Sequence, residues 1–164
     1  MKIAIFHQFL DNIGGSEIVC LTLARELKAD IYTTNIDKEK IKKMGFENVN
    51  VISIGKVPIH APWRQQLAFA RMRFLNLKNK YDCYIIGGDW AISSAINHKP
   101  NLWYVHSPIR EIYDLHKYVR QNMMADWKRP IFDLWVKYNR RLNKKYTAHA
   151  EKIICNSQQW LLKY

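Results

Sequence analysis

Six short apolar runs alternate with helix-like segments along this 164-residue chain. The runs cover residues 2–7, 30–34, 49–54, 82–87, 101–106 and 152–155, and the helical patterns cover 16–28, 37–44, 64–79, 91–97, 110–121, 131–148 and 157–163. Several runs lack polar alternation, for example Cys83 to Ile86, as expected of strands that are covered on both faces. Strands alternating with helices predict an α/β fold: a Rossmann-like three-layer α/β/α domain with a mainly parallel sheet.

The length and composition indicate one folded domain spanning residues 1–164. Hydrophobic residues make up 48% of the chain, which allows a sizeable core and argues against disorder. No run of about 18 or more apolar residues exists, so the sequence predicts no transmembrane helix. The chain begins directly with a strand-like run and lacks the pattern of a signal peptide. We therefore expect a cytoplasmic protein.

The cysteines and histidines do not form a recognisable catalytic or metal-binding pattern. Cys20, Cys83 and Cys155 lie far apart within apolar runs, so we expect reduced core residues. The six histidines are scattered, and no zinc spacing is present. The Gly-x-Ser-x-Gly elbow of serine hydrolases is also missing. The sequence thus predicts neither a metal site nor a serine triad.

The formal net charge of +12 is unevenly distributed. Residues 1–109 carry 14 basic and 9 acidic side chains, and residues 110–164 carry 12 and 5, so the net charges are +5 and +7. This surplus favours an anionic partner: nucleic acid, anionic lipid or a phosphorylated substrate. The basic and aromatic run 137–146 would suit a helix lying against anionic headgroups. A solvated basic face explains the same run equally well.

Polar residues follow four of the predicted strands. Because ligands of parallel α/β sheets bind at the carboxyl ends of the strands, four polar features at one edge predict a binding site there. These features are His7, the turn Gly87-Gly88-Asp89, the pair His106-Ser107 and the pair Asn156-Ser157.

A glycine pair, Gly14-Gly15, separates the first strand from the first helix, with Ser16 as the expected N-cap. Glycines let a ligand approach the backbone, and a helix N-terminus supplies N–H groups and positive dipole charge. This combination suits a phosphate or a sugar hydroxyl. The spacing matches neither the dinucleotide fingerprint nor a Walker loop. The alternative is a tight turn with no ligand.

Three charged or titratable residues at this edge each have two interpretations. His106 would hydrogen-bond a substrate hydroxyl or carry a proton, or else be a structural strand-end residue. Arg110 would pair with a phosphate or carboxylate, or else form a surface ion pair with Glu111 or Asp114. Asp89 would orient a hydroxyl, or else cap the helix expected near residue 91.

Three segments resemble motifs of the retaining glycosyltransferases of the GT-B fold, family four. They are Gly14 to Glu17, Tyr104 to Arg110 followed by Tyr113-Asp114, and Ile153 to Ser157. The resemblance covers essentially the whole chain. It implies the N-terminal, acceptor-side half of a GT-B fold. The C-terminal domain, which binds the nucleotide-sugar and carries a glutamate pair, is absent from this sequence, so we expect the chain alone to be inactive.

The resemblance also implies roles for individual residues. His106 would act as the catalytic residue beside the transferred sugar, and Gly14-Gly15 would face the donor diphosphate or the acceptor. Arg110 would flank a phosphate, and Glu17 matches the acidic residue that follows the glycine pair. The remaining expected substrate-binding residues at this edge are Asp89, Ser107, Asn156 and Ser157.

The implied reaction is retaining transfer of a hexosyl or mannosyl group from a nucleotide-sugar to a glycan or lipid-linked acceptor. The nucleotide-sugar is a co-substrate, and no metal or other cofactor is expected. The protein would position the acceptor hydroxyl and stabilise the leaving diphosphate. A lipid-linked acceptor would place the protein peripherally at the inner face of the membrane.

Two other functions remain open. The chain would also suit a non-catalytic module that binds an anion or a partner protein. A basic nucleic-acid-binding protein is a further alternative, which only the net charge supports, because no zinc-finger, RNA-recognition or K-homology signature is present.

Overall fold

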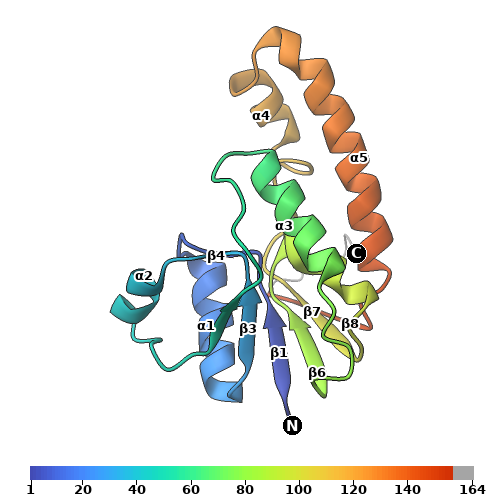
Figure 1. Ribbon diagram of the computed structural model, residues 1–164. Coiled ribbons are helices and arrows are strands. Elements are labelled where there is room, and N and C mark those ends of the chain that lie inside the picture. Colours follow the sequence, from blue (N-terminus) through green and yellow to red (C-terminus); the bar gives the residue numbers. More distant parts are fainter. Residues whose placement is uncertain (157–164) are drawn as a thin grey trace.

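The computed structural model describes residues 1–156, and its centre is a six-stranded sheet in which every pairing is parallel (Figure 1). The strand order is β5-β3-β1-β6-β7-β8. The strands are β1 (Ile3–Phe6), β3 (Asp30–Thr33), β5 (Val51–Ser53), β6 (Cys83–Ile86), β7 (Asn101–Val105) and β8 (Lys152–Cys155). The chain first builds outward from β1 through β3 to β5 and then returns to β6 on the other side. The order therefore reverses between β1 and β6, and such a switch point is where parallel α/β sheets bind ligands.

Helices cover both faces of this sheet (Figure 1). The α-helices are α1 (Gly15–Leu27), α2 (Lys38–Lys43), α3 (Trp63–Phe74), α4 (His116–Asn122) and α5 (Arg129–Thr147), and the 3₁₀ helices are η1 (Asp89–Ile96) and η2 (Asp126–Lys128). A small parallel pair, β2 (Phe9–Leu10) with β4 (Asn35–Ile36), lies outside the main sheet. In Figure 1, α4 and the first half of α5 extend beyond the carboxyl ends of the strands.

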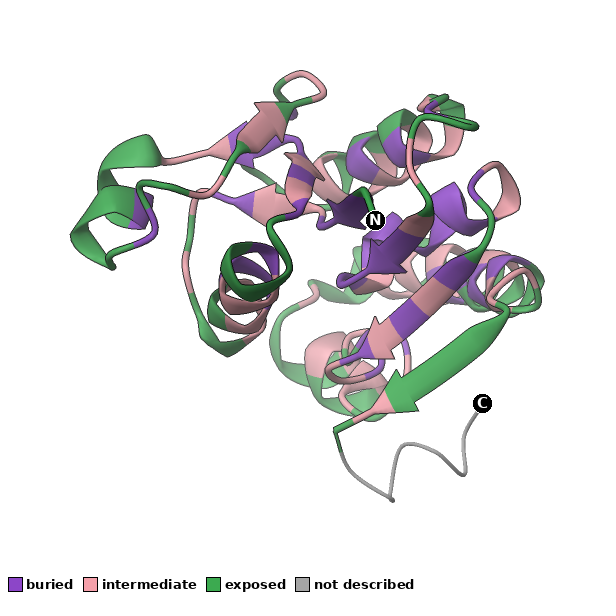
Figure 2. Ribbon diagram, turned by 90° about the horizontal axis from the view of Figure 1, so that it is seen from below, coloured by how far each residue is buried: buried purple, intermediate pink, exposed green. Residues whose placement is uncertain are grey.

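Alternate residues of β1 contribute to two separate cores, because successive strand side chains point to opposite faces. Ile3 and Ile5 pack with buried residues of α1 and α2. Ala4 and Phe6 pack with buried residues of α3, η1 and α5. The domain is therefore a Rossmann-like three-layer α/β/α sandwich, as the alternation of strands and helices predicts. Figure 2 shows that burial is greatest in the central strands and lowest in the edge strand β8.

All six predicted main-sheet strands are present, but several helix boundaries differ from the prediction. The helix predicted over 64–79 ends at Phe74, since Leu75 adopts an extended conformation. The segment 110–121 becomes helical only from His116, and 91–97 forms the 3₁₀ helix η1, which starts at Asp89. The short strands β2 and β4 were not predicted. The helix predicted over 157–163 lies outside the described residues.

The predicted N-cap of the first helix is wrong. Gly14 is the N-cap, and α1 begins at Gly15. The backbone of Gly14 is extended, and its N–H donates to the Glu17 carboxylate at 2.9 Å. A capping contact from the carboxylate three residues on therefore fixes the start of the helix, so the hydroxyl of Ser16 is not needed as the cap.

Within residues 1–156, no helix has both the length and the apolar character needed to cross a bilayer.

A buried asparagine, Asn101, joins η1 to the segment that leads into β8. Its Nδ2 atom lies 3.0, 2.7 and 3.2 Å from the carbonyl oxygens of Ala95, His98 and His149. Its Oδ1 atom accepts a hydrogen bond from the Glu151 N–H at 3.0 Å. One side chain therefore satisfies backbone groups of two segments, residues 95–98 and 149–151, which are distant from each other in the sequence.

Substitution of Asn101 by Ala should lower the free energy of unfolding by about 1–3 kcal/mol, because buried backbone groups lose their partner. Urea unfolding measures this difference. The exposed Asn122 provides a matched control, for which Asn122→Ala should change stability by less than about 0.5 kcal/mol. Equal effects of the two substitutions would contradict the role of Asn101.

Candidate functional site

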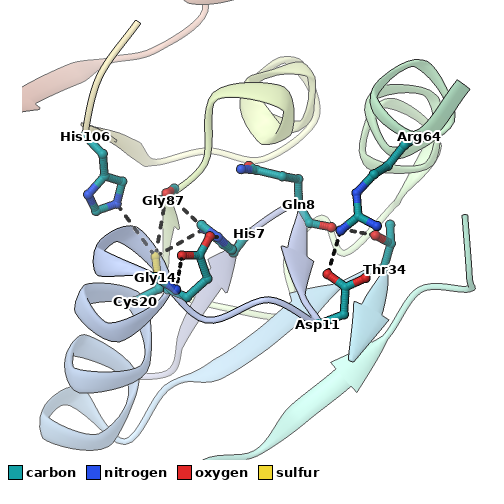
Figure 3. Close-up of polar contacts among 10 residues, drawn as sticks. His7, Gln8, Asp11, Gly14, Cys20, Thr34, Arg64, Gly87 and His106 are labelled. Atoms are coloured by element: carbon teal, nitrogen blue, oxygen red, sulfur yellow. Dashed lines mark hydrogen bonds and ion pairs between the residues drawn. The ribbon is translucent and has the colours of Figure 1, made fainter. Parts of the chain in front are cut away.

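A fully buried histidine, His7, lies at the switch point between β1 and β6 (Figure 3). Its Nδ1 atom is 3.0 Å from the carbonyl oxygen of Gly87, and its Nε2 atom is 3.0 Å from Oε1 of Glu17. Both of these partners are hydrogen-bond acceptors, so both ring nitrogens must donate. His7 is therefore a buried imidazolium that joins β1, α1 and the turn after β6.

Electrostatics agrees with this protonation state. Burial by itself lowers the pKa of His7, but the neighbouring Cys20 and Glu17 outweigh it and raise the pKa to about 10. Burial likewise raises the pKa of the Glu17 carboxyl, but the hydrogen bond and charge of His7 bring it down to about 2. The carboxylate of Glu17 thus stabilises the fold above its ordinary pKa of 4.5, and this contribution is lost as the pH falls towards 2.

Glu17 uses both of its carboxylate oxygens. Oε1 accepts from His7, and Oε2 accepts from the N–H of Gly14. One carboxylate therefore ties the start of α1 to the buried histidine, and this contact fixes the loop between β1 and α1.

Cys20, one turn further along α1, lies between two histidines (Figure 3). Its Sγ atom is 3.4 Å from Nδ1 of His7 and 3.9 Å from Nε2 of His106, and it donates to the Gly87 carbonyl at 3.6 Å. Burial raises the pKa of the thiol, but the charge of His7 and the hydrogen bonds of both histidines bring it down to about 7. Since its side chain is fully buried, Cys20 links the two histidines and offers no exposed nucleophile.

The expectation of core cysteines is confirmed for Cys20, which is buried, whereas Cys83 and Cys155 are half-buried. The contacts of Cys20 with the two histidines were not predicted. One signal for them exists: Glu17 and Cys20 are three residues apart, so they share a helix face. Which histidines that face meets depends on how the strands pair.

His106, like Glu17, is a half-buried residue of this cluster. It follows β7, its ring lies 4.8 Å from the ring of Tyr104, and its Nε2 faces Cys20. Val105 pairs with Cys155, so His106 and the exposed Asn156 come directly after paired residues of adjacent strands. The predicted residues His106 and Asn156 therefore lie at neighbouring strand ends, with the half-buried Ser107 next in the chain. Ser157 lies outside the described residues.

Asp89 is the first residue of η1, and Gly88 is the N-cap, so the expectation that Asp89 caps this helix is wrong. Its Oδ1 atom is buried and has no hydrogen-bond partner among residues 1–156. Burial raises the pKa of this carboxyl to about 7, although the charges of His106 and His7 act in the opposite direction. A protonatable carboxyl therefore lies within electrostatic range of both histidines.

Arg110 lies apart from these contacts. Its side chain is exposed, and its Nε atom is 3.2 Å from Oδ2 of Asp114. The structure thus contains the surface ion pair that the sequence offers as an alternative, and exposed pairs of this kind contribute little to stability. A phosphate contact of Arg110 stays a prediction.

The two glycine pairs, Gly14-Gly15 and Gly87-Gly88, differ in how much space a side chain would have at each position. A Cβ atom at Gly87 would overlap Sγ of Cys20, and one at Gly88 would overlap the side chain of Gln8. At Gly15, by contrast, a Cβ would meet nothing within 4 Å. Close packing therefore requires glycine at Gly87 in the turn after β6. At the start of α1 there is open space at Gly15, while a Cβ at Gly14 would lie 3.2 Å from Oε2 of Glu17.

A second polar group, which the sequence did not reveal, holds the β1–α1 loop against α3 (Figure 3). The Arg64 guanidinium donates to Asp11 at 2.6 Å and lies 3.9 Å from the ring centre of Phe9. Burial raises the pKa of Asp11, but Arg64 outweighs it and lowers the pKa. The loop is therefore anchored on one side by His7 and Glu17 and on the other by Arg64.

Comparison of the chain with protein-family models, curated proteins and solved structures found no match. Residues 1–156 contain no group of three or more His, Cys, Asp or Glu side chains arranged to hold a metal ion.

The close approach at Gly87 leads to a stability prediction. Gly87→Ala should lower the free energy of unfolding by about 1–3 kcal/mol, because the added methyl group overpacks the contact with Cys20. Gly15→Ala is the matched control and should be neutral or slightly stabilising, since it adds a methyl group in open space at a helical position. Urea unfolding of both variants measures these changes. An unchanged free energy of unfolding in Gly87→Ala would contradict the packing argument.

The ring of His7 should carry two protons at about pH 8, where an ordinary histidine is neutral. Nitrogen chemical shifts of the labelled side chain report this directly. Glu17→Gln should lower the pKa of His7, because the neighbouring negative charge is removed, whereas the exposed Glu47→Gln should leave it unchanged. A neutral His7 ring at this pH would contradict the assignment.

Proposed function

We propose that this chain is the acceptor-side domain of a retaining glycosyltransferase. It would act together with a nucleotide-sugar-binding domain, supplied in the same chain or by a partner. The observation that carries the proposal is the position of His106, which is half-buried at a strand end and linked through Cys20 to the ion pair of His7 with Glu17. The resemblance of three sequence segments to this class of enzyme supports the same function.

The chemistry available at this edge suits sugar transfer. A retaining transfer passes through an oxocarbenium-like state and releases a diphosphate, so it needs a group that positions hydroxyls and groups that stabilise negative charge. His106 would position the sugar by hydrogen-bonding one of its hydroxyls. The N–H groups in the first turn of α1, beyond Gly14, would stabilise the negative charge of the leaving diphosphate. A helix N-terminus has unpaired N–H groups, and Gly15 leaves them open to a ligand.

Asp89 and the His7–Glu17 pair would act on the site through His106. The Asp89 carboxyl, with its pKa near 7, sets the local charge beside the histidine. The ion pair keeps the β1–α1 loop and Cys20 in place. The contact of the His106 Nε2 atom with Cys20 would then orient the ring of His106. In this proposal the nucleotide-sugar is a co-substrate, and the reaction requires no metal.

A non-catalytic anion-binding module is the second candidate, because most of the positive charge lies outside this site. Among residues 116–147 there are nine Lys and Arg against two Asp. Under this alternative the chain would bind an anionic partner without transferring a sugar. Binding of generic RNA or DNA with a steep salt dependence would instead favour a nucleic-acid-binding protein.

The test is sugar transfer by the product of the complete gene, assayed with a panel of labelled nucleotide-sugars and with glycan or lipid-linked acceptors. His106→Ala should lower kcat/KM by about 100-fold or more, since a positioned proton-transfer or hydroxyl-binding group is lost. His60 is exposed in a loop, so His60→Ala is the matched control and should keep full activity.

Two results would overturn the proposal. One is full transfer activity in His106→Ala, which would remove the role given to the histidine. The other is the absence of both transfer and saturable nucleotide-sugar or saccharide binding across the panel, which would leave the anion-binding alternative.

A further inference from the structure

The hairpin of α4, η2 and α5 (residues 116–147) exposes an unusual number of large apolar side chains. Six of them are more than half exposed: Tyr118, Met123, Trp127, Ile131, Leu134 and Tyr138. Figure 1 shows the turn of this hairpin at the end of the molecule furthest from the N-terminus. Exposed apolar groups gathered on one element mark an interaction surface.

On α5 the exposed apolar residues form a stripe. Ile131, Leu134 and Tyr138 are separated by three and four residues, so they lie along one side of the helix. Arg141 and Lys145, which are also exposed, continue the same spacing towards the sheet. The stripe is thus apolar near the turn of the hairpin and basic nearer the body of the domain.

The opposite side of α5 is already occupied by the core. Val136, Asn139, Asn143 and Tyr146 are buried on it. Gln66 of α3 donates to Asn139 at 2.9 Å, and Tyr113 donates to Asn143 at 2.9 Å. The exposed stripe is therefore a second face of α5, which packing within the domain does not use.

The charge on the hairpin is strongly positive and mostly uncompensated. The nine Lys and Arg against two Asp give residues 116–147 a formal net charge of +7. Both aspartates are engaged inside the hairpin, Asp133 with Arg120 at 2.9 Å and Asp126 with Arg129 at 2.8 Å. Lys137, Arg141 and Lys144 form no ion pair within the described part of the chain.

A groove of about 520 Å³ between α4 and α5 gathers several of these cations. It is lined by His116, Arg120, Asp133, Val136, Lys137, Arg140 and Arg141. Because Asp133 already pairs with Arg120 and His116, the groove offers positive charge to a ligand. Its rim residues Lys137 and Arg141 lie one helical turn from Leu134 and Tyr138, so cations and the apolar stripe share one exposed surface.

We propose that this hairpin docks onto an anionic lipid bilayer. The apolar stripe enters the interface, and Lys137, Arg141, Lys144 and Lys145 lie at the level of the headgroups. A bilayer supplies a negative surface directly above an apolar layer, which matches the order of side chains along α5. Trp127 at the turn, Tyr118 on α4 and Tyr138 on α5 suit the same boundary, since their rings are apolar and their polar atoms reach water.

A second copy of this chain fits the surface less well than a bilayer. Two hairpins placed face to face would bring together two formal charges of +7. The inference goes beyond the proposed function and does not rest on it, because lipid binding requires neither a sugar nor a nucleotide.

Vesicle co-sedimentation of the full chain tests the proposal. We expect binding to vesicles of phosphatidylcholine mixed with phosphatidylserine and much weaker binding to phosphatidylcholine alone. Leu134→Glu should weaken binding by about tenfold or more, because an apolar side chain can no longer enter the interface. Phe74, which is 80% exposed at the end of α3, provides the matched control, and Phe74→Glu should bind as the wild type does.

Charge reversal gives an independent arm of the test. The triple variant Lys137→Glu, Arg141→Glu and Lys144→Glu should abolish the preference for phosphatidylserine. The control is the triple variant Lys38→Glu, Lys42→Glu and Lys43→Glu, in which three exposed lysines of α2 are reversed and the net charge changes by the same amount. This variant should largely retain the preference for phosphatidylserine. Circular dichroism confirms that each variant is folded before its binding is compared.

Two outcomes would overturn the proposal. Equal losses in the two triple variants would show attraction by net charge alone, without a defined docking element. Concentration-dependent self-association that Leu134→Glu abolishes, together with no vesicle binding, would assign the stripe to a second copy. Neither outcome depends on sugar transfer, so failure here is distinguishable from failure of the proposed function.

Discussion

The contact between the buried His7 and the half-buried Glu17 is the interaction on which the rest of the site depends. It joins the end of β1, the first turn of α1 and the turn after β6, because the imidazolium and the carboxylate each contact a further backbone group. A buried ion pair is tolerated only when its remaining polar atoms are also satisfied. Here Gly87 and Gly14 provide those partners, so the pair fixes three chain segments relative to one another.

This constraint determines what the open edge of the sheet can present. With β1, α1 and β6 held together, Cys20 lies against both histidines and Gly87 has no room for a side chain. His106 remains half-buried beside them. The basic α4–α5 hairpin is a separate feature of the same molecule, since its apolar stripe and cations point away from the core that holds the site. Site and hairpin can therefore be tested independently.

Local sequence predicted the architecture well, and it predicted contacts poorly. The apolar runs located all six main-sheet strands. Burial on both faces explains the continuous apolar pattern of the central strands β1 and β6, whereas the edge strand β8 is largely exposed. The strands β2 and β4 are two residues long and carry no periodicity to detect. The segment after Arg110 reads as helical from its spacing, but turns replace the helix until His116. Contacts such as that of Arg64 with Asp11 join residues far apart in the chain, so the local pattern of apolar residues cannot predict them.

The sequence by itself determined the order of strands and helices, the excess of positive charge after residue 109 and the polar residues that follow four of the strands. These properties are local, since each depends on neighbouring residues only. The tertiary structure alone decided that β6 lies beside β1, that Cys20 meets two histidines and that the turn after β6, more than the turn before α1, requires glycine. Strand order and side-chain packing depend on which distant segments come together, because hydrogen bonds and van der Waals contacts act only at short range in space.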